Sequence, residues 1–208
     1  MRVEKRPPMI QSRRMITEMP QFTDEQKKLM TALESYEPWD EQEARHREVI
    51  LDQVRATALW WHRDTLPGHV TASGFVTDPS LSFLLLHHHR KLDRWLQLGG
   101  HDEGEKDPMK AVLREVREES GLREFRFQGS GGLFDLDVHM IPESSKQKAH
   151  NHLDCRFLLV ADPEAPLVRE ETESKALQWF PLGEALTKMN EVGAVRVVQK
   201  IQKLKSMT

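Results

Sequence analysis

Cysteine is almost absent from this chain of 208 residues, because Cys155 is the single one. One cysteine excludes an intrachain disulfide and a zinc site built from cysteines. No run of residues approaches the ~18 apolar positions that a membrane-spanning helix requires, and the basic N-terminal segment lacks the apolar core of a secretory signal. We therefore expect a cytoplasmic protein that does not contact a membrane.

A large net charge is lacking too. Lys and Arg contribute 30 residues and Asp and Glu contribute 33, which leaves a formal charge of -3. Without an overall basic field, nucleic acid is not expected as a partner. Hydrophobic residues make up 38% of the chain, which is enough for a folded core. A small anionic substrate would have to be bound by local basic groups.

The pattern of residues divides the chain into three parts. Residues 1–21 are basic, contain several prolines and show no periodicity, which indicates an arm whose function is not evident. Residues 22–67 are expected to form a helical extension, because Thr23 and Asp40 are each followed three residues later by Gln or Glu, as in a capping box. The apolar stripe of the second helix comprises Val49, Ile50, Val54, Ala58 and Trp61. Residues 68–208 are expected to form the main domain.

Within the main domain, β-rich segments are interrupted by two helical patterns. Strands are expected at about 69–78, 80–89, 131–140, 154–162 and 176–182. A helix is expected from 108 to 120, where Gly121 ends it. A final helix is expected from about 182 or 192 to 204.

Three glutamates on the helix at 108–120 are the main candidate for chemistry. Glu115, Glu118 and Glu119 have i, i+3 and i+4 spacing, so they lie on one helical face. Three like charges so close repel one another unless a cation neutralises them. Hard oxygen ligands without cysteine suit Mg²⁺ or Mn²⁺. An acidic run of this kind can also be a solvated helix face, which is the common alternative.

The segment GHDEGEKDPMKAVLREVREESGL, residues 100–122, resembles the signature of the Nudix hydrolase family. The matching residues are Gly100, Arg114, Glu115, Val116, Glu118, Glu119, Gly121 and Leu122. The first Glu of the signature falls on Lys106, with Glu105 and Asp107 on either side. The resemblance implies a Nudix-type α/β/α sandwich with a mixed β-sheet, to which the helical N-terminal extension is added. It also implies Mg²⁺-dependent hydrolysis of a phosphoanhydride bond.

The resemblance further implies roles for individual residues. Glu115, Glu118, Glu119 and the carbonyl of Gly100 would bind the metal, and Glu118 and Glu119 would act in catalysis. Arg114 would orient the carboxylates through a bidentate contact, although it could instead bind a substrate phosphate. Gly121 would be structural. An ordinary turn is the alternative explanation for Gly100.

A further carboxylate from a later loop often acts as a metal ligand or general base in the family. Glu173 and Glu171 are the candidates here, and Asp135 and Asp137 on an expected strand are weaker ones. Solvated acidic loops are common, so each of these residues could also lack a catalytic role.

Ten histidines are many for this length, and several of them cluster along the chain. His101, His150 and His152 could contact the diphosphate or form a second metal site. Strand alternation would place His150, His152 and Asp154 on one face. Other clustered histidines are His87, His88, His89 and His139. The alternative is that these polar rings at strand ends have no ligand and only form hydrogen bonds.

Basic residues at the end of the second expected strand could bind phosphates. Arg90 and Arg94 are the candidates, and Trp95 could stack on a base. A basic hairpin rim explains the same residues without a ligand.

The interpretation is a hydrolase of a nucleoside diphosphate linked to another moiety, with Mg²⁺ or Mn²⁺ as cofactor and a nucleotide-like diphosphate as small-molecule partner. A catalytically weak Nudix-fold module that binds a nucleotide is the alternative, because Lys106 replaces the signature's Glu. Isomerisation of an isoprenoid diphosphate is a third hypothesis, but no motif surrounds Cys155 to favour it. A homodimer is one assembly that the sequence leaves open.

Overall fold

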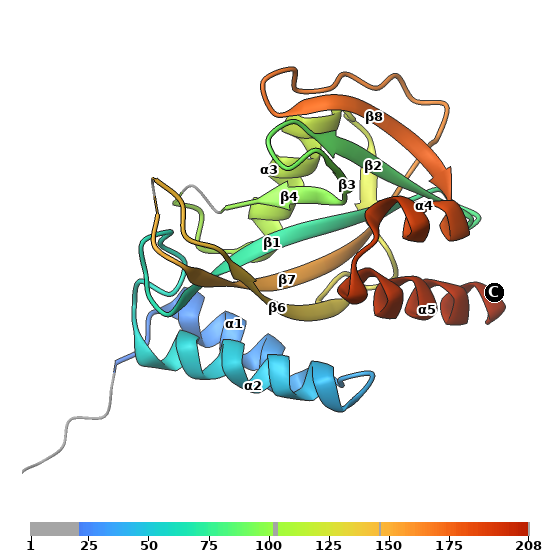
Figure 1. Cartoon of the computed structure of the whole chain (residues 1–208). Coiled ribbons are helices and arrows are strands. Elements are labelled where there is room, and N and C mark those ends of the chain that lie inside the picture. Colours follow the sequence, from blue (N-terminus) through green and yellow to red (C-terminus); the bar gives the residue numbers. More distant parts are fainter. Residues whose placement is uncertain (1–20, 102–103, 146, 208) are drawn as a thin grey trace, which may run out of the picture.

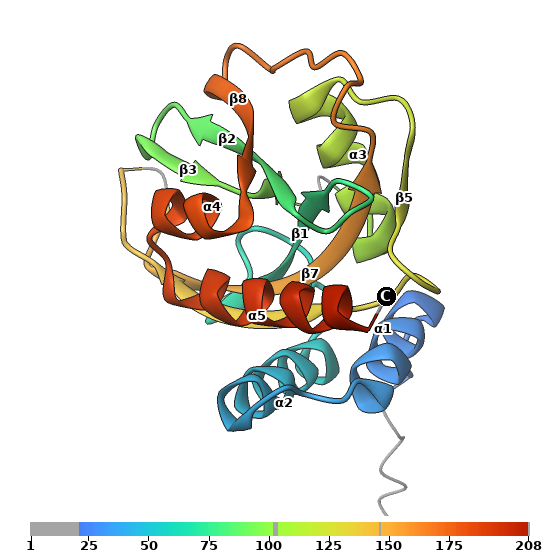
Figure 2. The same ribbon diagram turned by 90° about the vertical axis from the view of Figure 1, so that its right-hand side faces the viewer.

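A computed structural model describes residues 21–101, 104–145 and 147–207 of the chain. The expected arm, residues 1–21, lies outside these ranges except for its last residue. The described chain forms a strongly curled β-sheet with helices packed on both of its faces (Figures 1 and 2). This arrangement confirms the expected α/β fold with a mixed sheet and helices before it in the sequence.

The sheet has eight strands among the described residues, in the order β3-β2-β1-β7-β5 along one path. In addition, β4 pairs with β1, β6 with β7 and β8 with β2. The pair β1–β7 is parallel, whereas the other pairs are antiparallel. The strands are β1 (Gly68–Thr77), β2 (Phe83–His89), β3 (Arg94–Leu96), β4 (Leu98–Gly100), β5 (Phe125–Phe127), β6 (Asp135–Ile141), β7 (His150–Ala161) and β8 (Ser174–Pro181).

Helices cover both faces of the sheet: α1 (Asp24–Ser35), α2 (Glu41–Ala56), α3 (Pro108–Ser120), α4 (Leu182–Met189) and α5 (Val192–Ser206). The two expected N-terminal caps form. The Thr23 hydroxyl accepts from the Gln26 N–H at 3.2 Å, and the Asp40 carboxylate accepts from the Glu43 N–H at 2.7 Å. Such caps satisfy N–H groups that the first turn of a helix leaves unpaired.

Several expected boundaries were wrong: β2 and β6 begin later than expected, at Phe83 and Asp135, and β7 begins earlier, at His150. The second helix ends at Ala56, so Ala58 and Trp61 lie beyond the helix that was expected to contain them. Trp60 is the residue that enters the core there, and its carbonyl accepts from the Val70 N–H at 2.8 Å. At the C-terminus there are two helices in place of one, because Asn190 adopts a left-handed conformation with φ 48°.

Alternate residues of the central strands supply two hydrophobic cores. Val70, Val76 and Leu85 belong to the core covered by α1, α2 and α3. Phe75, Leu84, Leu86 and Leu158 belong to the core under α4 and α5, together with Ala185, Val197 and Ile201. Because side chains point alternately to the two faces of a strand, each strand contributes to both cores.

A buried network of charges joins the N-terminal helices to the sheet. The carboxylates of Glu43 in α2 and Asp135 in β6 are both inaccessible to solvent. Lys200 of α5 contacts both of them, at 2.8 Å for Asp135, and Arg196 donates to Asp135 at 2.7 Å. Glu43 also accepts from the backbone N–H of Leu136 at 3.0 Å. These contacts fix α2 against β6 and α5.

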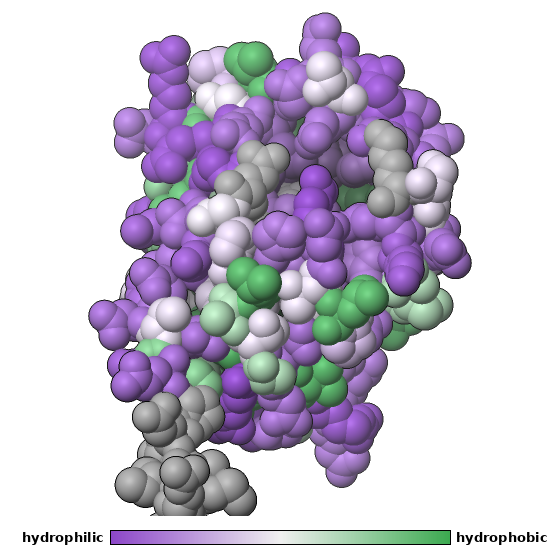
Figure 3. Space-filling model, turned by 90° about the vertical axis from the view of Figure 1, so that its left-hand side faces the viewer, coloured by the Kyte–Doolittle hydropathy of each residue, from purple (hydrophilic) through white to green (hydrophobic). Residues whose placement is uncertain are grey.

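The molecular surface at the end of the sheet where β1 begins is mainly hydrophilic, with hydrophobic residues gathered in a band below its centre (Figure 3). No helix in the described ranges is both long and apolar enough to span a bilayer.

Candidate active site

Helix α3 is held in place by its two ends and by one close contact with the sheet. Asp107 caps its start by accepting from the Met109 N–H at 3.1 Å, and Gly121 ends it with φ 69°. A Cβ on Gly74 of β1 would lie 2.8 Å from Val116 and 3.0 Å from Val112. The absence of a side chain at Gly74 therefore lets α3 lie close against β1.

The three glutamates of α3 differ in their exposure. Glu115 and Glu119 are buried, whereas the side chain of Glu118 is 57% exposed. Glu119 accepts a 2.7 Å hydrogen bond from the backbone N–H of Gly99. A Cβ on Gly100 would lie 3.2 Å from the Glu115 carboxylate, so Gly100 packs against that carboxylate. A freely solvated helix face therefore does not describe Glu115 and Glu119.

Arg114 bridges two of these carboxylates. Its guanidinium lies 2.8 Å from Glu115 and 2.9 Å from Glu118, and it donates to the carbonyl of His101 at 2.9 Å. The guanidinium thus makes one contact with each of two carboxylates, and its role in orienting them stays a prediction. The same guanidinium ties the residue after β4 to α3.

Burial raises the pKa of Glu119 well above its ordinary value. The hydrogen bond from Gly99 acts in the opposite direction, and the nearby carboxylates of Glu115, Glu173 and Glu118 raise the pKa further. His87 lies on the other side of Glu119, with 3.5 Å between Nδ1 and Oε1, and it also contacts the Ser174 hydroxyl at 2.8 Å. The sequence placed His87 at the end of a strand but contained no sign of its contact with Glu119.

The residues around the missing signature Glu make local contacts. The Lys106 ammonium lies 5.4 Å from the centroid of the Trp61 ring. Glu105 accepts from the Asp107 N–H at 3.0 Å, and Asp107 pairs with Lys28 of α1. Asp107 therefore links the loop before α3 to α1, and Lys106 links it to the segment after α2.

Of the candidates for the additional carboxylate, Glu173 lies where its charge acts on Glu119. It precedes β8, and its backbone carbonyl accepts from the Arg90 N–H at 2.7 Å. Glu171, two residues earlier, is exposed. Asp135 and Asp137 face a different region, because Arg156 contacts them at 3.4 and 3.1 Å.

The two arginines proposed to bind phosphates contact backbone carbonyls. Arg90 donates to the carbonyl of Glu171 at 3.1 Å, which places it beside the loop that contains Glu173. Arg94 donates to the carbonyl of Met189 at 3.1 Å, at the end of α4. Substrate binding by either arginine stays a prediction.

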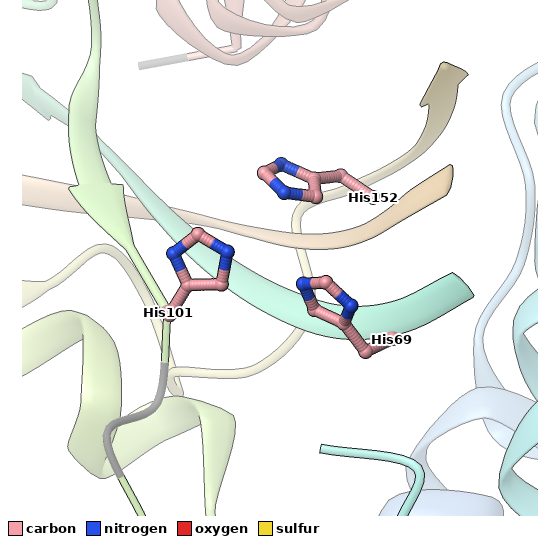
Figure 4. A group of neighbouring side chains, drawn as sticks. All are labelled: His69, His101 and His152. Carbon is pink, nitrogen blue, oxygen red and sulfur yellow. The ribbon is translucent and has the colours of Figure 1, made fainter. Parts of the chain in front are cut away.

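Histidines from three neighbouring strands and from the residue after β4 gather at one end of the sheet. His69 of β1 and His139 of β6 are both register partners of His152 in β7. The rings of His69, His101 and His152 form a triangle with centroid separations of 5.0 to 5.2 Å, and they point toward one another (Figure 4). His150 stacks on His69 at 5.0 Å. His69 was not among the candidates, because sequence spacing does not reveal which strands pair.

The three rings of this triangle are neutral at physiological pH. Burial lowers the pKa of His69 to about 3, and the neighbouring His101, His150 and Arg63 lower it further, against a weak effect of the Thr65 backbone. Burial, followed by the charges of neighbouring groups, also lowers the pKa of His101 to about 4 and that of His152 to about 2. Neutral imidazole is the form that binds metals.

Cys155 is fully buried within β7 and belongs to the hydrophobic core. A side chain without access to solvent does not serve as a nucleophile for a bound substrate. The position of Cys155 therefore gives the isomerase hypothesis no support.

The donor groups near α3 suit a divalent cation with hard oxygen ligands. Two buried carboxylates, Glu115 and Glu119, lie beside the guanidinium of Arg114, and the charge of Glu173 adds to theirs. A surplus of buried negative charge is costly unless a cation compensates it. The residues present therefore fit Mg²⁺ or Mn²⁺ better than a soft metal.

This chain is similar in sequence to known proteins. Residues 67–201 match the family model of the NUDIX domain. A Lactococcus lactis subsp. cremoris protein, "Probable DHNTP pyrophosphohydrolase", is 31% identical over 115 residues, which cover 54% of this chain and 63% of that relative. The alignment therefore spans less than two thirds of the relative's length.

Solved structures with similarity to this chain include two hydrolases. The binary complex of a C. elegans Ap4A hydrolase superposes with a TM-score of 0.52 at 16% identity, over 67% of this chain and 98% of that one. A NUDIX-family hydrolase from Clostridium perfringens is 27% identical with a TM-score of 0.47, over 65% of this chain and 97% of that one. At 16% identity, the similarity to the C. elegans structure supports the fold alone.

Proposed function

The chain belongs to the NUDIX family, and from this premise we propose that it hydrolyses a phosphoanhydride bond in a nucleoside diphosphate linked to another moiety. The observation that supports this most is the pair of buried carboxylates, Glu115 and Glu119, held against Gly99 and Gly100. Residues 68–208 would form the catalytic domain and residues 22–67 its helical extension.

Divalent metal ions are the general cofactors of NUDIX enzymes, and we propose Mg²⁺ or Mn²⁺ here. The bound ion would polarise a phosphoryl oxygen and lower the pKa of the attacking water. Glu115, Glu118, Glu119 and the carbonyl of Gly100 are its proposed ligands. Arg114 would keep the carboxylates of Glu115 and Glu118 in position, since it contacts them at 2.8 and 2.9 Å.

Glu173 is the proposed general base. Its charge raises the pKa of Glu119 and it lies in an exposed turn before β8, which supports a role in activating a water beside the metal ligands. Arg90, in the β2–β3 connection, contacts this turn through the carbonyl of Glu171 and would bind a phosphate of the substrate. Because the Lactococcus relative is a probable DHNTP pyrophosphohydrolase, DHNTP is one compound to include among candidate substrates.

The test is a turnover assay with Mg²⁺ or Mn²⁺ on nucleoside diphosphates linked to different moieties, with products separated by chromatography. The wild-type chain is expected to release a phosphorylated product. Glu118→Gln and Glu119→Gln are expected to lower the rate by at least roughly 100-fold, because each removes charge that stabilises the transition state. Glu124→Gln, at an exposed position outside α3, is the matched control and is expected to retain the rate.

The role of Glu173 has its own pair of variants. Glu173→Gln is expected to lower kcat, whereas Glu171→Gln on the same exposed loop is expected to leave it unchanged. If Glu173→Gln kept the same undiminished kcat as Glu171→Gln, Glu173 would not be the general base.

A nucleotide-binding module without turnover is the second candidate, and Lys106 at the signature's Glu position favours it. Nucleotide binding by calorimetry, with no product at any Mg²⁺ or Mn²⁺ concentration, would support that alternative over hydrolysis.

Size-exclusion chromatography with light scattering tests whether the chain forms a homodimer.

A further inference from the structure

The triangle of histidines suggests a second metal site beside the glutamates of α3. His69, His101 and His152 each offer one ligand atom, and these atoms lie within 4.8 Å of one another. The rings come from β1, from the end of β4 and from β7, and they converge on a common point (Figure 4). No negatively charged side chain is part of this group, so its chemistry differs from that of the proposed Mg²⁺ ligands.

Unpartnered nitrogen atoms are the second observation. Although the Thr65 backbone lies close enough to raise the pKa of His69 slightly, this residue has no exposed surface, and neither of its ring nitrogens has a well-aligned hydrogen-bond partner among the described residues. The same is true of Nε2 of His101 and Nε2 of His150. A buried polar atom without a partner is energetically costly. A cation bound between the rings would give one nitrogen of His69 and Nε2 of His101 a partner and remove that part of the cost.

We propose that His69, His101 and His152 bind one divalent transition-metal ion of the Zn²⁺ type. Imidazole nitrogen is a good ligand for Zn²⁺, Co²⁺ and Ni²⁺, whereas Mg²⁺ prefers oxygen. Three histidines also leave a coordination position for water or for a ligand oxygen. At Zn–N distances of about 2.0–2.1 Å, tetrahedral ligand atoms lie roughly 3.3 Å apart, so the rings must approach by at most about 1.5 Å.

Two neighbouring groups constrain the site. Nδ1 of His150 contacts the carbonyl of Lys148 at 2.7 Å, which fixes that ring next to His69, and His150 is not among the residues whose ligand atoms converge within 4.8 Å. Arg63 lies 3.5 Å from Nδ1 of His101. A metal on Nε2 of His101 would leave the ring proton on Nδ1 and end this weak contact. Because Arg63 is exposed, solvent screens its repulsion of the cation.

The site adjoins the glutamates but does not depend on them. His101 directly follows Gly100, which packs against Glu115, and the His101 carbonyl accepts from Arg114. His101 and His152 are half-buried, so an ion can reach the triangle from solvent. An ion held here would lie next to the proposed diphosphate site.

The experiment uses the untagged full chain, stripped with a chelator and titrated with Zn²⁺ or Co²⁺ in excess Mg²⁺ to occupy oxygen sites. Calorimetry and elemental analysis are expected to give about one ion per chain, and Co²⁺ is expected to produce the visible absorption of a nitrogen-ligated site. His69→Gln, His101→Gln and His152→Gln are each expected to weaken binding by more than about 100-fold, since each removes a ligand.

Controls separate this proposal from folding defects and from the proposed hydrolysis. His150→Gln, on the same strand as His152, and His62→Gln, on the surface, are expected to bind the ion within a few-fold of wild type. Half-buried His101 tests the site if His69→Gln does not fold, as judged by circular dichroism. Glu118→Gln is expected to retain Zn²⁺ binding even if it abolishes turnover. Wild-type protein that binds no Zn²⁺ or Co²⁺ in excess Mg²⁺, or ligand variants that bind like wild type, would overturn the site.

Discussion

The backbone N–H of Gly99 donates a 2.7 Å hydrogen bond to the buried carboxylate of Glu119. Gly99 has φ 142°, a conformation that side chains other than glycine rarely adopt, and a Cβ there would lie 2.5 Å from the carbonyl oxygen of Ala72. The N–H that supports Glu119 therefore depends on a position that only glycine can occupy without strain.

Gly99→Ala is expected to lower kcat together with stability. The added methyl must displace β4 from β1, because the atoms it meets first belong to the backbone. The strain is expected to cost about 1–3 kcal/mol in urea unfolding. Gly183→Ala is the control, because a Cβ at Gly183 has no atom within 4 Å and the backbone is helical. Equal stability of the two variants would contradict this account.

Lys106→Glu restores the signature's acidic residue and is expected not to raise the turnover rate. The ammonium of Lys106 lies 5.4 Å from the centroid of the Trp61 ring, so the side chain at 106 is engaged with the N-terminal extension. Loss of the cation–π contact is expected to cost no more than about 1 kcal/mol. Steady-state kinetics of Lys106→Glu and Lys106→Ala test this. A Lys106→Glu enzyme that is about tenfold faster would instead indicate that Lys106 makes the wild-type chain catalytically weak.

Lys200→Met is expected to lower the free energy of unfolding by about 3–5 kcal/mol, because it removes positive charge that compensates two buried carboxylates. Lys200 contacts both Glu43 and Asp135, which have no exposed surface. Lys203→Met, on the surface of the same helix, removes only a contact with the Trp39 ring and is the control. Urea unfolding of the two variants should separate a buried network from a surface contact.

Asp78 is expected to stabilise the β1–β2 connection in a pH-dependent way. Burial raises the pKa of Asp78, but hydrogen bonds from Ser80, Phe83 and Ser82 outweigh it and hold the pKa below its ordinary value. A lowered pKa means that the stabilisation is present above the unfolded pKa of about 3.9 and is lost as the pH falls through the folded pKa.

Asp78→Asn should therefore lose about 1–3 kcal/mol at pH 7, and the difference from wild type should shrink below about pH 4. Urea unfolding at both pH values is the measurement. Asp162→Asn, at an exposed turn, is the control. A deficit that is constant with pH would show that the charge of Asp78 is not responsible.

Local sequence signals determined where the N-terminal helices begin and how the three glutamates of α3 are arranged. Capping residues set the starts of α1 and α2, and the i, i+3 and i+4 spacing of Glu115, Glu118 and Glu119 is sufficient to put them on one face of α3. These features depend on residues at most a few positions apart, so the sequence alone contains the physical information. Local signals did not predict where α2 ends, because the packing of Trp60 into the core determines that boundary.

Only the tertiary structure decided which distant residues meet. The parallel register of β1 and β7 brings His69 next to His152, although the two residues are far apart in the chain, and no periodic pattern encodes that pairing. The contact between His87 and Glu119 and the buried ion pairs of Glu43 arise in the same way. Strand pairing and burial depend on the free energy of the whole core. Local sequence patterns specify the individual elements, and the packing of the core then decides which of their residues meet.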